Sequence, residues 1–554
     1  MIQNFTLRID DAMQIRAAAL QSMWRSLWNV MVFMAAGWQC AVADGPLDVV
    51  QRRVTAICQN LHTATVRIRS GSDVSSGVIV SETGLVLSVA HGLTPRSDTA
   101  TVLFPGGKTC EAKRVVVNEQ ADFALLVMDV ASLTDVDWSI VPVPTAGFSV
   151  LGEVVVASGF PAREPDGMLS VVRLGEIVAV DQLAVKTSCI LTTGDSGGPL
   201  VNSRGELIGL HRQIGVGTEE NGHVALAAIR RALEKTSHWK SLTQQGGADA
   251  ILFSKQLAPG PQVVTATRSA TVEIHGSDAG GRSSVRVLGT VLDQQEVATK
   301  LSEIFPYSAL MCRFADGSTI AATLSKSDQT LDLAILKLAS PYENGNAAIS
   351  AVSVFQNSTV RCGHTVFAAT SPYDVAAAGM IGRVGHDETP LPARFGATMQ
   401  SDAERVHITE LSPNGSAVLA GLLVGDVLHQ VDATDISSLQ AMGFLLMGRQ
   451  PGDWITIDVH RAMKRLDVQA QLQHDPREQY GKTEYLDGRT GRVSQRRSGF
   501  FEVLQHDIAM EPAACGGPLV DIEGHIVAIN IARRARESTL AIPIEDVQKF
   551  ANSE

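Results

Sequence analysis

The chain contains two copies of one ordered series of segments, and this internal duplication constrains its fold more than any other feature. The stretch ATVRIRSGS, which begins at Ala64, corresponds to ATVEIHGSD, which begins at Ala270. DFALLVMDV from Asp122 corresponds to DLAILKLAS from Asp332, and GGPLVNSRGELIGL corresponds to GGPLVDIEGHIVAI. Self-similarity of this kind indicates that one fold has been built twice in the same chain.

Both copies consist of short apolar runs with alternating polar residues, separated by turns rich in Gly, Asn and Asp. This pattern predicts antiparallel β-barrels and not βαβ units. At 554 residues the chain is too long for a single core. Its 45% apolar residues, 19% charged residues and 48 glycines are typical of a globular, turn-rich protein. We therefore expect a mainly β protein with several domains.

Residues 23–45 have the pattern of a secretory signal peptide. Arg25 precedes an apolar stretch, and the AVA sequence at 41–43 fits a cleavage site. We therefore expect residues 1–43 to be removed and the mature chain to be exported, without a stable membrane span afterwards. Translation that starts at Met23 is an alternative for the N-terminus. An uncleaved anchor is the alternative for the apolar stretch, which is short for a membrane span.

The charge balance and the cysteine pattern exclude two classes of partner. The 46 basic and 58 acidic side chains give a net charge of −12, and no run of Lys and Arg is long enough for a nucleic-acid footprint. No CxxC pair or Cys/His spacing predicts a zinc site, so we expect neither a metal nor another cofactor. The cysteines that follow the leader allow several disulfide pairings, and the sequence chooses none of them. They are Cys58, Cys110, Cys189, Cys312, Cys362 and Cys515.

The first copy contains the three residue types that nucleophilic acyl transfer requires. His91 lies in LVLSVAHGL, Asp122 in NEQADFALLV and Ser196 in LTTGDSGGPLV. A serine hydroxyl is a weak nucleophile at neutral pH, so it needs an imidazole to take its proton and a carboxylate to orient that imidazole. The glycines beside Ser196 allow a tight turn that directs the N–H groups of Gly194 and Ser196 at one point, where an oxyanion would bind.

The order His, Asp, Ser, with AH after an apolar run, DFALL and GDSGGPLV, resembles the trypsin-like double β-barrel serine proteases. Intervals of 31 and 74 residues between the three positions, the expected export and a PDZ-like segment look like the HtrA/Deg branch. The resemblance implies an exported, periplasmic or similarly located endopeptidase that cleaves unfolded or damaged proteins. In that mechanism Ser196 attacks a peptide carbonyl, His91 acts as base and then acid, and Asp122 orients His91.

Activation and specificity depend on the residues around this set. Gly92 follows His91 and the chain has no Ile-Val-Gly-Gly start, so we do not expect activation by a newly cut N-terminus.

Six positions before the nucleophile, where many trypsin-like relatives carry the residue at the base of the S1 pocket, the chain has Ile190. An apolar S1 pocket would prefer small aliphatic side chains, although Ile190 is equally interpreted as an ordinary core residue. Asp195 has no assigned role.

The second copy keeps the carboxylate of this site but lacks the histidine that would act as its base. Aligning the copies with one gap pairs three positions with the candidate residues of the first: Ser302, Asp332 and Cys515 stand opposite His91, Asp122 and Ser196. A cysteine nucleophile still needs a neighbouring imidazole or cation that lowers its pKa. His506, nine residues upstream of Cys515, would reach it only through an unexpected path of the loop. We therefore interpret the second copy as a degenerate protease barrel, kept for structure, binding or regulation.

A module of domain size interrupts the second copy. Its interval between the carboxylate and nucleophile positions is 183 residues, 109 more than in the first copy. The excess includes SPNGSAVLAGLLVGDVLHQVD at 412–432, which is similar to a PDZ domain of the HtrA/Deg type. The preceding RFGA resembles the carboxylate-binding loop of that family, although a plain β-turn is the alternative. Successive N–H groups of Phe395, Gly396 and Ala397 would bind a peptide's terminal carboxylate, while the adjacent strand edge pairs with its backbone.

These patterns divide the chain into six segments and predict a helix at 227–239. The segments are a signal peptide at 1–43, an active trypsin-like domain at 44–239, a linker at 240–266, the first part of a degenerate trypsin-like domain at 267–388, an inserted PDZ-like domain at 389–475 and the last part of the degenerate domain at 476–554.

Two other functions stay open from the sequence. In one, both barrels are scaffolds and the PDZ-like module is the working part of a non-proteolytic chaperone or peptide-binding scaffold. In the other, the chain is a cysteine peptidase centred on Cys515. Members of the HtrA/Deg family often assemble as trimers, but this sequence does not fix whether the chain forms a homo-oligomer. The natural substrate is equally open.

Overall fold

The computed structural model describes most of the chain after residue 45. The described ranges are 46–95, 97–133, 135–145, 149–215, 217, 221–234, 236–244, 258–277, 284–343, 360–371, 373, 377–402, 405–474 and 491–553. The predicted signal peptide and the alternative start at Met23 lie outside them. The chain divides into two compact units, Met1–Val49 and Val50–Glu554, and the second contains both copies and the PDZ-like segment. None of the helices in these ranges combines the length and apolar character needed to cross a bilayer.

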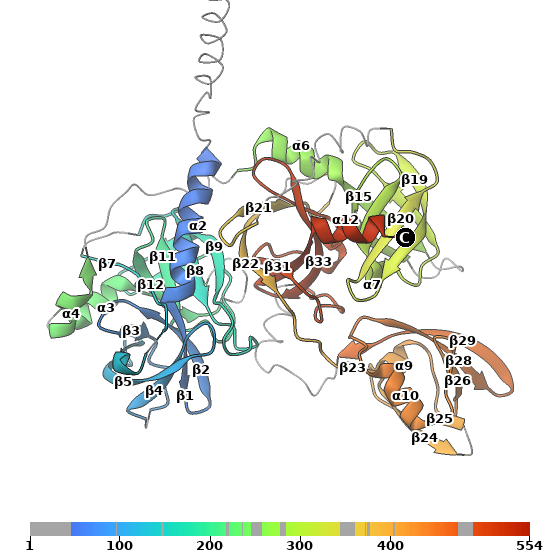
Figure 1. Cartoon of the computed structure of the whole chain (residues 1–554), viewed down its shortest axis with the longest axis horizontal. Coiled ribbons are helices and arrows are strands. Elements are labelled where there is room, and N and C mark those ends of the chain that lie inside the picture. Colours follow the sequence, from blue (N-terminus) through green and yellow to red (C-terminus); the bar gives the residue numbers. More distant parts are fainter. Residues whose placement is uncertain are drawn as a thin grey trace, which may run out of the picture. The chain divides into compact units, whose positions relative to one another are not determined.

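The first copy forms two closed antiparallel barrels, which follow helix α2 (Pro46–Ala64) (Figure 1). The first barrel contains β1 (Thr65–Ser70), β2 (Asp73–Ile79), β3 (Leu85–Ser88), β4 (Thr99–Leu103), β5 (Thr109–Asn118) and β6 (Phe123–Met128). The second contains β8 (Val154–Gly159), β9 (Val171–Val180), β10 (Ala184–Thr187), β11 (Pro199–Asn202), β12 (Leu207–Gln213) and β13 (Asn221–Ala225). The remaining elements are η1 (Val130–Ser132), β7 (Val143–Pro144), α3 (Leu226–Leu233), α4 (Ser237–Leu242) and β14 (Thr243–Gln244), which pairs with β7.

The second copy repeats this plan with two further closed barrels. Helix α6 (Pro261–Ala270) leads into β15 (Thr271–Ser277), β16 (Ser284–Val291), β17 (Glu296–Lys300), α7 (Leu301–Ile304), β18 (Ala309–Arg313), β19 (Thr319–Asp328) and β20 (Leu333–Leu338). The last barrel is built from β21 (Thr365–Ala368), β22 (Ala377–His386), β31 (Val503–His506), β32 (Pro518–Val520), β33 (Ile526–Ala535) and β34 (Ser538–Pro543), with η2 (Pro512–Ala514) before β32 and α12 (Ile544–Asn552) at the end. The mainly β fold class predicted from the sequence is confirmed.

The PDZ-like segment lies between two strands that pair with each other, because β22 pairs with β31 across it. It opens and closes with a short ribbon of β23 (Ala393–Arg394) and β30 (Gln473–His474). Its sheet has the order β24 (Ala397–Asp402), β25 (Arg405–Leu411), β26 (Val427–Val431), β28 (Trp454–Arg461) and β29 (Lys464–Gln471), and β27 (Thr434–Asp435) pairs with β26. Helices α9 (Ser416–Leu419) and α10 (Leu439–Leu446) complete it.

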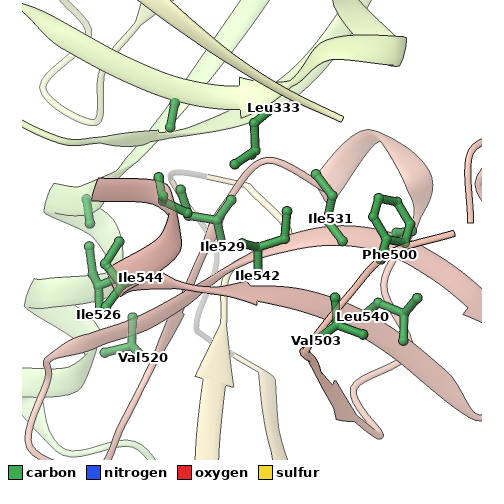
Figure 2. Packing of buried hydrophobic residues seen from close by; sticks show 14 of the residues in the cluster. Leu333, Phe500, Val503, Val520, Ile526, Ile529, Ile531, Leu540, Ile542 and Ile544 are labelled. Carbon is green, nitrogen blue, oxygen red and sulfur yellow. The ribbon is translucent and has the colours of Figure 1, made fainter. Parts of the chain in front are cut away.

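A continuous apolar core joins the two barrels of the second copy (Figure 2). Leu333 comes from β20 in one barrel, whereas Ile529, Ile531 and Leu540 come from β33 and β34 in the other. Alanines of α6 and Ile544 of α12 belong to the same cluster. Burial of this apolar surface holds the two barrels together without any help from catalytic residues.

Two local expectations are wrong. The linker expected at 240–266 is shorter, because α4 continues to Leu242 and α6 begins at Pro261. Ala266 and Ala270 of α6 are buried in the core shown in Figure 2, so this small, polar-looking stretch is part of the second copy. The single helix expected at 227–239 is replaced by α3, which ends at Leu233, and by a separate α4.

We expect Ile529→Ala to lower the free energy of unfolding by about 2–5 kcal/mol, because it leaves a cavity in a fully buried core. The change is measured by urea denaturation followed by tryptophan fluorescence. Leu324→Ala, at a side chain that is 45% exposed, is the matched control and should change stability by less than about 0.5 kcal/mol. Equal effects of the two substitutions would contradict the assignment of this core.

Candidate active site and its degenerate copy

The candidate residues of the first copy come from both of its barrels. His91 follows β3 and Asp122 precedes β6 in the first barrel, whereas Ser196 precedes β11 in the second. Ser76 of β2 joins the two sides, because its N–H donates to Ser196 O at 2.8 Å and its hydroxyl donates to Gly194 O at 2.9 Å. The site therefore lies where the two barrels meet.

The contact between His91 and Asp122 fixes one side of the imidazole. Nδ1 of His91 lies 2.8 Å from Asp122 Oδ2 and 3.0 Å from Oδ1, and the His91 backbone N–H donates to Oδ1 at 3.1 Å. Asp122 adopts a left-handed φ of 56°, which brings its carboxylate under the histidine. Arg212 Nε donates to the same carboxylate at 3.2 Å.

Asp122 remains ionised in this environment. Burial raises the pKa of its carboxyl, but the hydrogen bonds from the His91 ring and backbone, and the charges of His91 and Arg212, outweigh burial and lower it. The side chain of His91 is 48% exposed.

The loop before Ser196 leaves two backbone donors available. The Asp195 N–H donates to the carbonyl of Thr192, and the Gly197 N–H donates to that of His211. The Gly198 N–H donates to the carbonyl of Asp195. In the part of the chain that the structure describes, the N–H groups of Gly194 and Ser196 have no protein acceptor. In the same described part, Ser196 Oγ makes no hydrogen bond with His91.

Asp195, to which the sequence assigned no role, is held by a buried partner. Arg173 Nη1 of β9 lies 2.7 Å from Asp195 Oδ2, and both residues are at most 1% exposed. The Thr192 N–H donates to the same oxygen at 2.8 Å. Burial raises the pKa of Asp195 although Arg173 opposes this. The pair anchors the residue directly before the candidate nucleophile. An acidic residue inside GDSGG was the visible signal, but the sequence did not name Arg173.

Ile190 is buried, at 8% exposure, and its neighbours in the sequence, Cys189 and Leu191, belong to the core of the second barrel. Its position is compatible with the wall of an apolar pocket and equally with a core residue. Its role in an S1 pocket therefore stays a prediction.

The second copy reproduces the carboxylate contact with a serine in place of histidine. Ser302 N donates to Asp332 Oδ1 at 2.7 Å, and Ser302 Oγ donates to Oδ2 at 2.8 Å. Asp332 has a φ of 54°, close to that of Asp122. Lys300, which is fully buried, places Nζ 3.7 Å from Asp332 Oδ2. The carboxylate thus keeps its place, but among the described residues no imidazole bonds to it.

Cys515 occupies the nucleophile position without an activating partner in the described residues. Its side chain is buried, and burial raises the pKa of its thiol even though the Lys300 charge opposes this. Its Sγ lies 3.9 Å from Ser494 Oγ. His506 bonds through Nε2 to Asn530 Oδ1 at 2.7 Å, and no bond between His506 and Cys515 is present among these residues. Among the described residues, Cys515 has no bond to an imidazole, and the charge of Lys300 does not outweigh the effect of burial on the pKa of its thiol.

The PDZ-like segment covers the position of Ser302. Trp454 Nε1 of β28 donates to Ser302 O at 3.0 Å, and the Trp454 ring lies 5.9 Å from that of Phe305. Asp453 forms an ion pair of 3.2 Å with Arg496. A cavity of about 100 Å³ remains among these groups, lined also by Asp332. The region around Ser302 is therefore covered by protein on the side of Trp454.

The RFGA loop lies at the open edge of the PDZ-like sheet. Phe395 and Gly396 accept hydrogen bonds from Ala417 N and Ser412 N through their carbonyls, at 2.9 Å each. In the described residues, the N–H groups of Phe395 and Gly396 have no acceptor. Among the described strands, β24, which starts at Ala397, pairs with β25 alone, and helix α10 lies beside it.

One turn of the second copy brings together side chains that could bind a metal ion. Within the described ranges, the group that offers three metal-ligating atoms close together is Asp521, Glu523 and His525 in the β32–β33 turn. Asp521 accepts the N–H groups of Glu523 and His525 and lies 3.1 Å from His525 Nδ1. These bonds close the turn, so the group carries no metal assignment.

Two family models match the chain. A trypsin-like peptidase domain matches residues 75–210, which contain His91, Asp122 and Ser196. A PDZ domain matches residues 393–472, which contain the RFGA loop and β24–β29.

Curated proteins with similar sequences are serine proteases by name. Serine protease HTRA1B of Danio rerio is 32% identical over 181 residues, which cover 30% of this chain and 36% of that protein. A probable periplasmic serine endoprotease DegP-like of Halomonas elongata is 24% identical over 68% of this chain and 74% of its own length. Serine endoprotease DegS of Haemophilus influenzae is 31% identical over a region that covers 25% of this chain and 41% of that protein. A crystal structure of the serine endoprotease from Yersinia pestis aligns over 77% of this chain and 98% of that chain, at 16% identity and a TM-score of 0.29.

The two aspartates should give opposite pH dependences of stability. Burial raises the pKa of Asp332 to about 6 from an ordinary value of 3.8, although Lys300, Arg496 and the bonds from Ser302 oppose it. Its stabilising contribution is therefore complete below pH 3.8 and is lost as the pH rises through 6. When the pH is lowered from 7.5 to 4.5, the free energy of unfolding of the wild type should rise by about 2 kcal/mol more than that of Asp332→Asn.

Asp122→Asn is the matched control for this measurement. The pKa of Asp122 is lowered, so its contribution is present above its ordinary pKa and is lost as the pH falls. Urea midpoints at the two pH values compare both variants with the wild type. A pH response of Asp332→Asn identical to that of the wild type would contradict the raised pKa.

Proposed function

This chain belongs with the HtrA-type serine proteases through its trypsin-like peptidase and PDZ domains, and from that premise we propose that it is a serine endopeptidase acting on unfolded or damaged proteins. His91, Asp122 and Ser196 are the proposed catalytic residues. The observation that carries the proposal is the 2.8 Å contact between His91 Nδ1 and Asp122, which leaves the other ring nitrogen, Nε2, to act as the base.

The proposed reaction follows from this arrangement. As Ser196 Oγ attacks the peptide carbonyl, its proton passes to His91 Nε2, and the ionised Asp122 stabilises the imidazolium that forms. The available N–H groups of Gly194 and Ser196 stabilise the oxyanion. The imidazolium then gives its proton to the leaving amine, and the C–N bond breaks. Water, deprotonated by the same imidazole, attacks the acyl-enzyme and releases the acid product and Ser196.

We further propose that the PDZ domain binds the free carboxyl terminus of a peptide. The available N–H groups at Phe395 and Gly396 suit a carboxylate, and the open edge of β24 can accept an added strand. Apolar side chains on and beside α10 are exposed, among them Leu439 at 44% and Phe444 at 61%. They provide apolar surface for the side chains of such a peptide.

A non-proteolytic chaperone or peptide-binding scaffold is the second candidate, because Ser196 Oγ has no hydrogen bond to His91 in the described residues. The cysteine-peptidase alternative has less support, because Cys515 is buried and its thiol pKa is raised. Export is proposed from the signal-peptide pattern and from the periplasmic location named for the Halomonas relative.

The purified chain should degrade fluorescein-labelled casein, and Ser196→Ala should reduce turnover at least about 1,000-fold, because the nucleophile is removed. Cys515→Ala is the matched control and should retain wild-type turnover. Release of fluorescent peptides measures both. Equal turnover by the wild type and Ser196→Ala would favour the scaffold function, and loss in Cys515→Ala alone would favour the cysteine peptidase.

A decapeptide with a free C-terminal carboxylate should bind the full chain at least about tenfold more tightly than its C-terminal amide, because charge-assisted bonds to the loop are lost in the amide. Calorimetry on Ser196→Ala measures both affinities without cleavage. Gly396→Val should weaken the acid form, because Gly396 has a φ of 74° and a Cβ there would lie 2.7 Å from Gly415 Cα. Equal affinity for acid and amide contradicts the proposed loop.

A further inference from the structure

The second copy contacts the first along two strands whose backbones lie close together. Asp507 accepts the N–H of Leu174 in β9 through Oδ2 at 2.6 Å and the N–H of Met380 in β22 through Oδ1 at 2.7 Å. A Cβ on Gly382 of β22 would lie 2.4 Å from Val172 O of β9. The degenerate copy is thus packed directly against the barrel that carries Ser196.

Residues 534–537, which are the end of β33 and the two residues before β34 and are called the 534–537 turn below, extend this contact to a loop of the first copy. Arg534 Nη1 pairs with Glu164 Oε1, and Glu537 Oε2 lies 3.1 Å from Arg163 Nη2. The side chain of Glu537 is completely buried, and that of Arg163 is 11% exposed. An ion pair shielded from water in this way holds its partners more firmly than a surface pair does.

The same loop is bonded to the segment that precedes the candidate nucleophile. Ala162 N donates to Thr193 O at 2.7 Å, and Arg163 Nη2 donates to Thr192 Oγ1 at 3.3 Å. Because the carbonyl and the N–H of a trans peptide point in opposite directions, the bond to Thr193 O also sets the direction of the Gly194 N–H. A chain of contacts therefore runs from Glu537 to a donor of the proposed oxyanion site.

A second link from the turn reaches the segment after β12. Arg536, which is fully buried, donates to the carbonyls of Gly215 at 3.3 Å and Gly217 at 3.0 Å. Gly215 lies three positions after Arg212, whose Nε bonds to Asp122. The 534–537 turn thus touches both loops that flank the candidate site, one on the side of Ser196 and one on the side of Asp122.

We propose that the 534–537 turn of the degenerate copy positions the active site of the first copy, so that the protease domain is incomplete without its second copy. Glu537 acts through Arg163 and Thr192 on the proposed oxyanion donors, and Arg536 holds the carbonyl groups of Gly215 and Gly217. These are positioning residues, because neither touches the reacting atoms. The inference deepens the proposed function and rests on it. It also gives the degenerate copy a role that needs no nucleophile or base of its own.

The test compares kcat and KM on fluorescein-labelled casein for variants of the full chain. Glu537→Gln and Arg163→Gln should each lower kcat about tenfold or more with little change in KM, because donors that stabilise only the transition state lose their position. The double variant should be no worse than either single variant, since both break one link. Arg163→Lys, which keeps the charge, should retain more of kcat than Arg163→Gln.

Arg496→Gln is the matched control, because Arg496 is a buried arginine of the second copy whose contacts are with Asp453, Thr330 and the Phe500 ring. Its kcat should stay within about twofold of the wild type, and melting curves should show that every variant compared is folded. Wild-type kcat in folded Glu537→Gln and Arg163→Gln overturns the inference while the proposed function stands. A wild-type chain that leaves casein intact removes the proposed function, and the inference with it.

Discussion

An aspartate in the left-handed conformation joins two segments of a barrel in each copy, and both candidate sites are arranged around it. Asp122 and Asp332 each accept the backbone N–H of the residue that stands at the histidine position, as well as that residue's side chain. The backbone bond does not depend on which side chain is present. This explains why the second copy keeps its carboxylate after the loss of the histidine, and why a retained carboxylate alone is no sign of catalysis.

The same reasoning separates what the sequence could predict from what it could not. The duplication, the barrels and the inserted PDZ-like segment are carried by local patterns of turns and alternating residues, and these were predicted. The pairing of Ser302 with Asp332 followed from aligning the two copies. Arg173 as the partner of Asp195 was not predicted, and neither were the contacts of the 534–537 turn. Arg163 and Glu537 are 374 positions apart, so only the packing of one copy on the other brings them together.

The second copy contacts both the PDZ domain and the first copy, and its own sequence pattern predicts neither contact. On one side Trp454 of the PDZ domain covers the backbone of Ser302, and on another the 534–537 turn meets the loops of the first copy. The place where a second active site would stand is thus used to hold the PDZ domain. If the second barrel is not catalytic, as we propose, a covered Ser302 and a buried Cys515 cost it no activity. A serine at the histidine position is therefore compatible with the contact that the same residue makes with Trp454 of the PDZ domain.

The central claim is that one copy is catalytic and the other is not, and an active-site-directed reagent tests it most directly. The full chain is treated with diisopropyl fluorophosphate, which forms a stable adduct with an activated serine, and the adduct is located by peptide mass mapping. Our account predicts one adduct per chain, on Ser196, with none on Ser302 or Cys515 and none at all in His91→Ala. An unlabelled wild-type chain, or an adduct within the second copy, would contradict it.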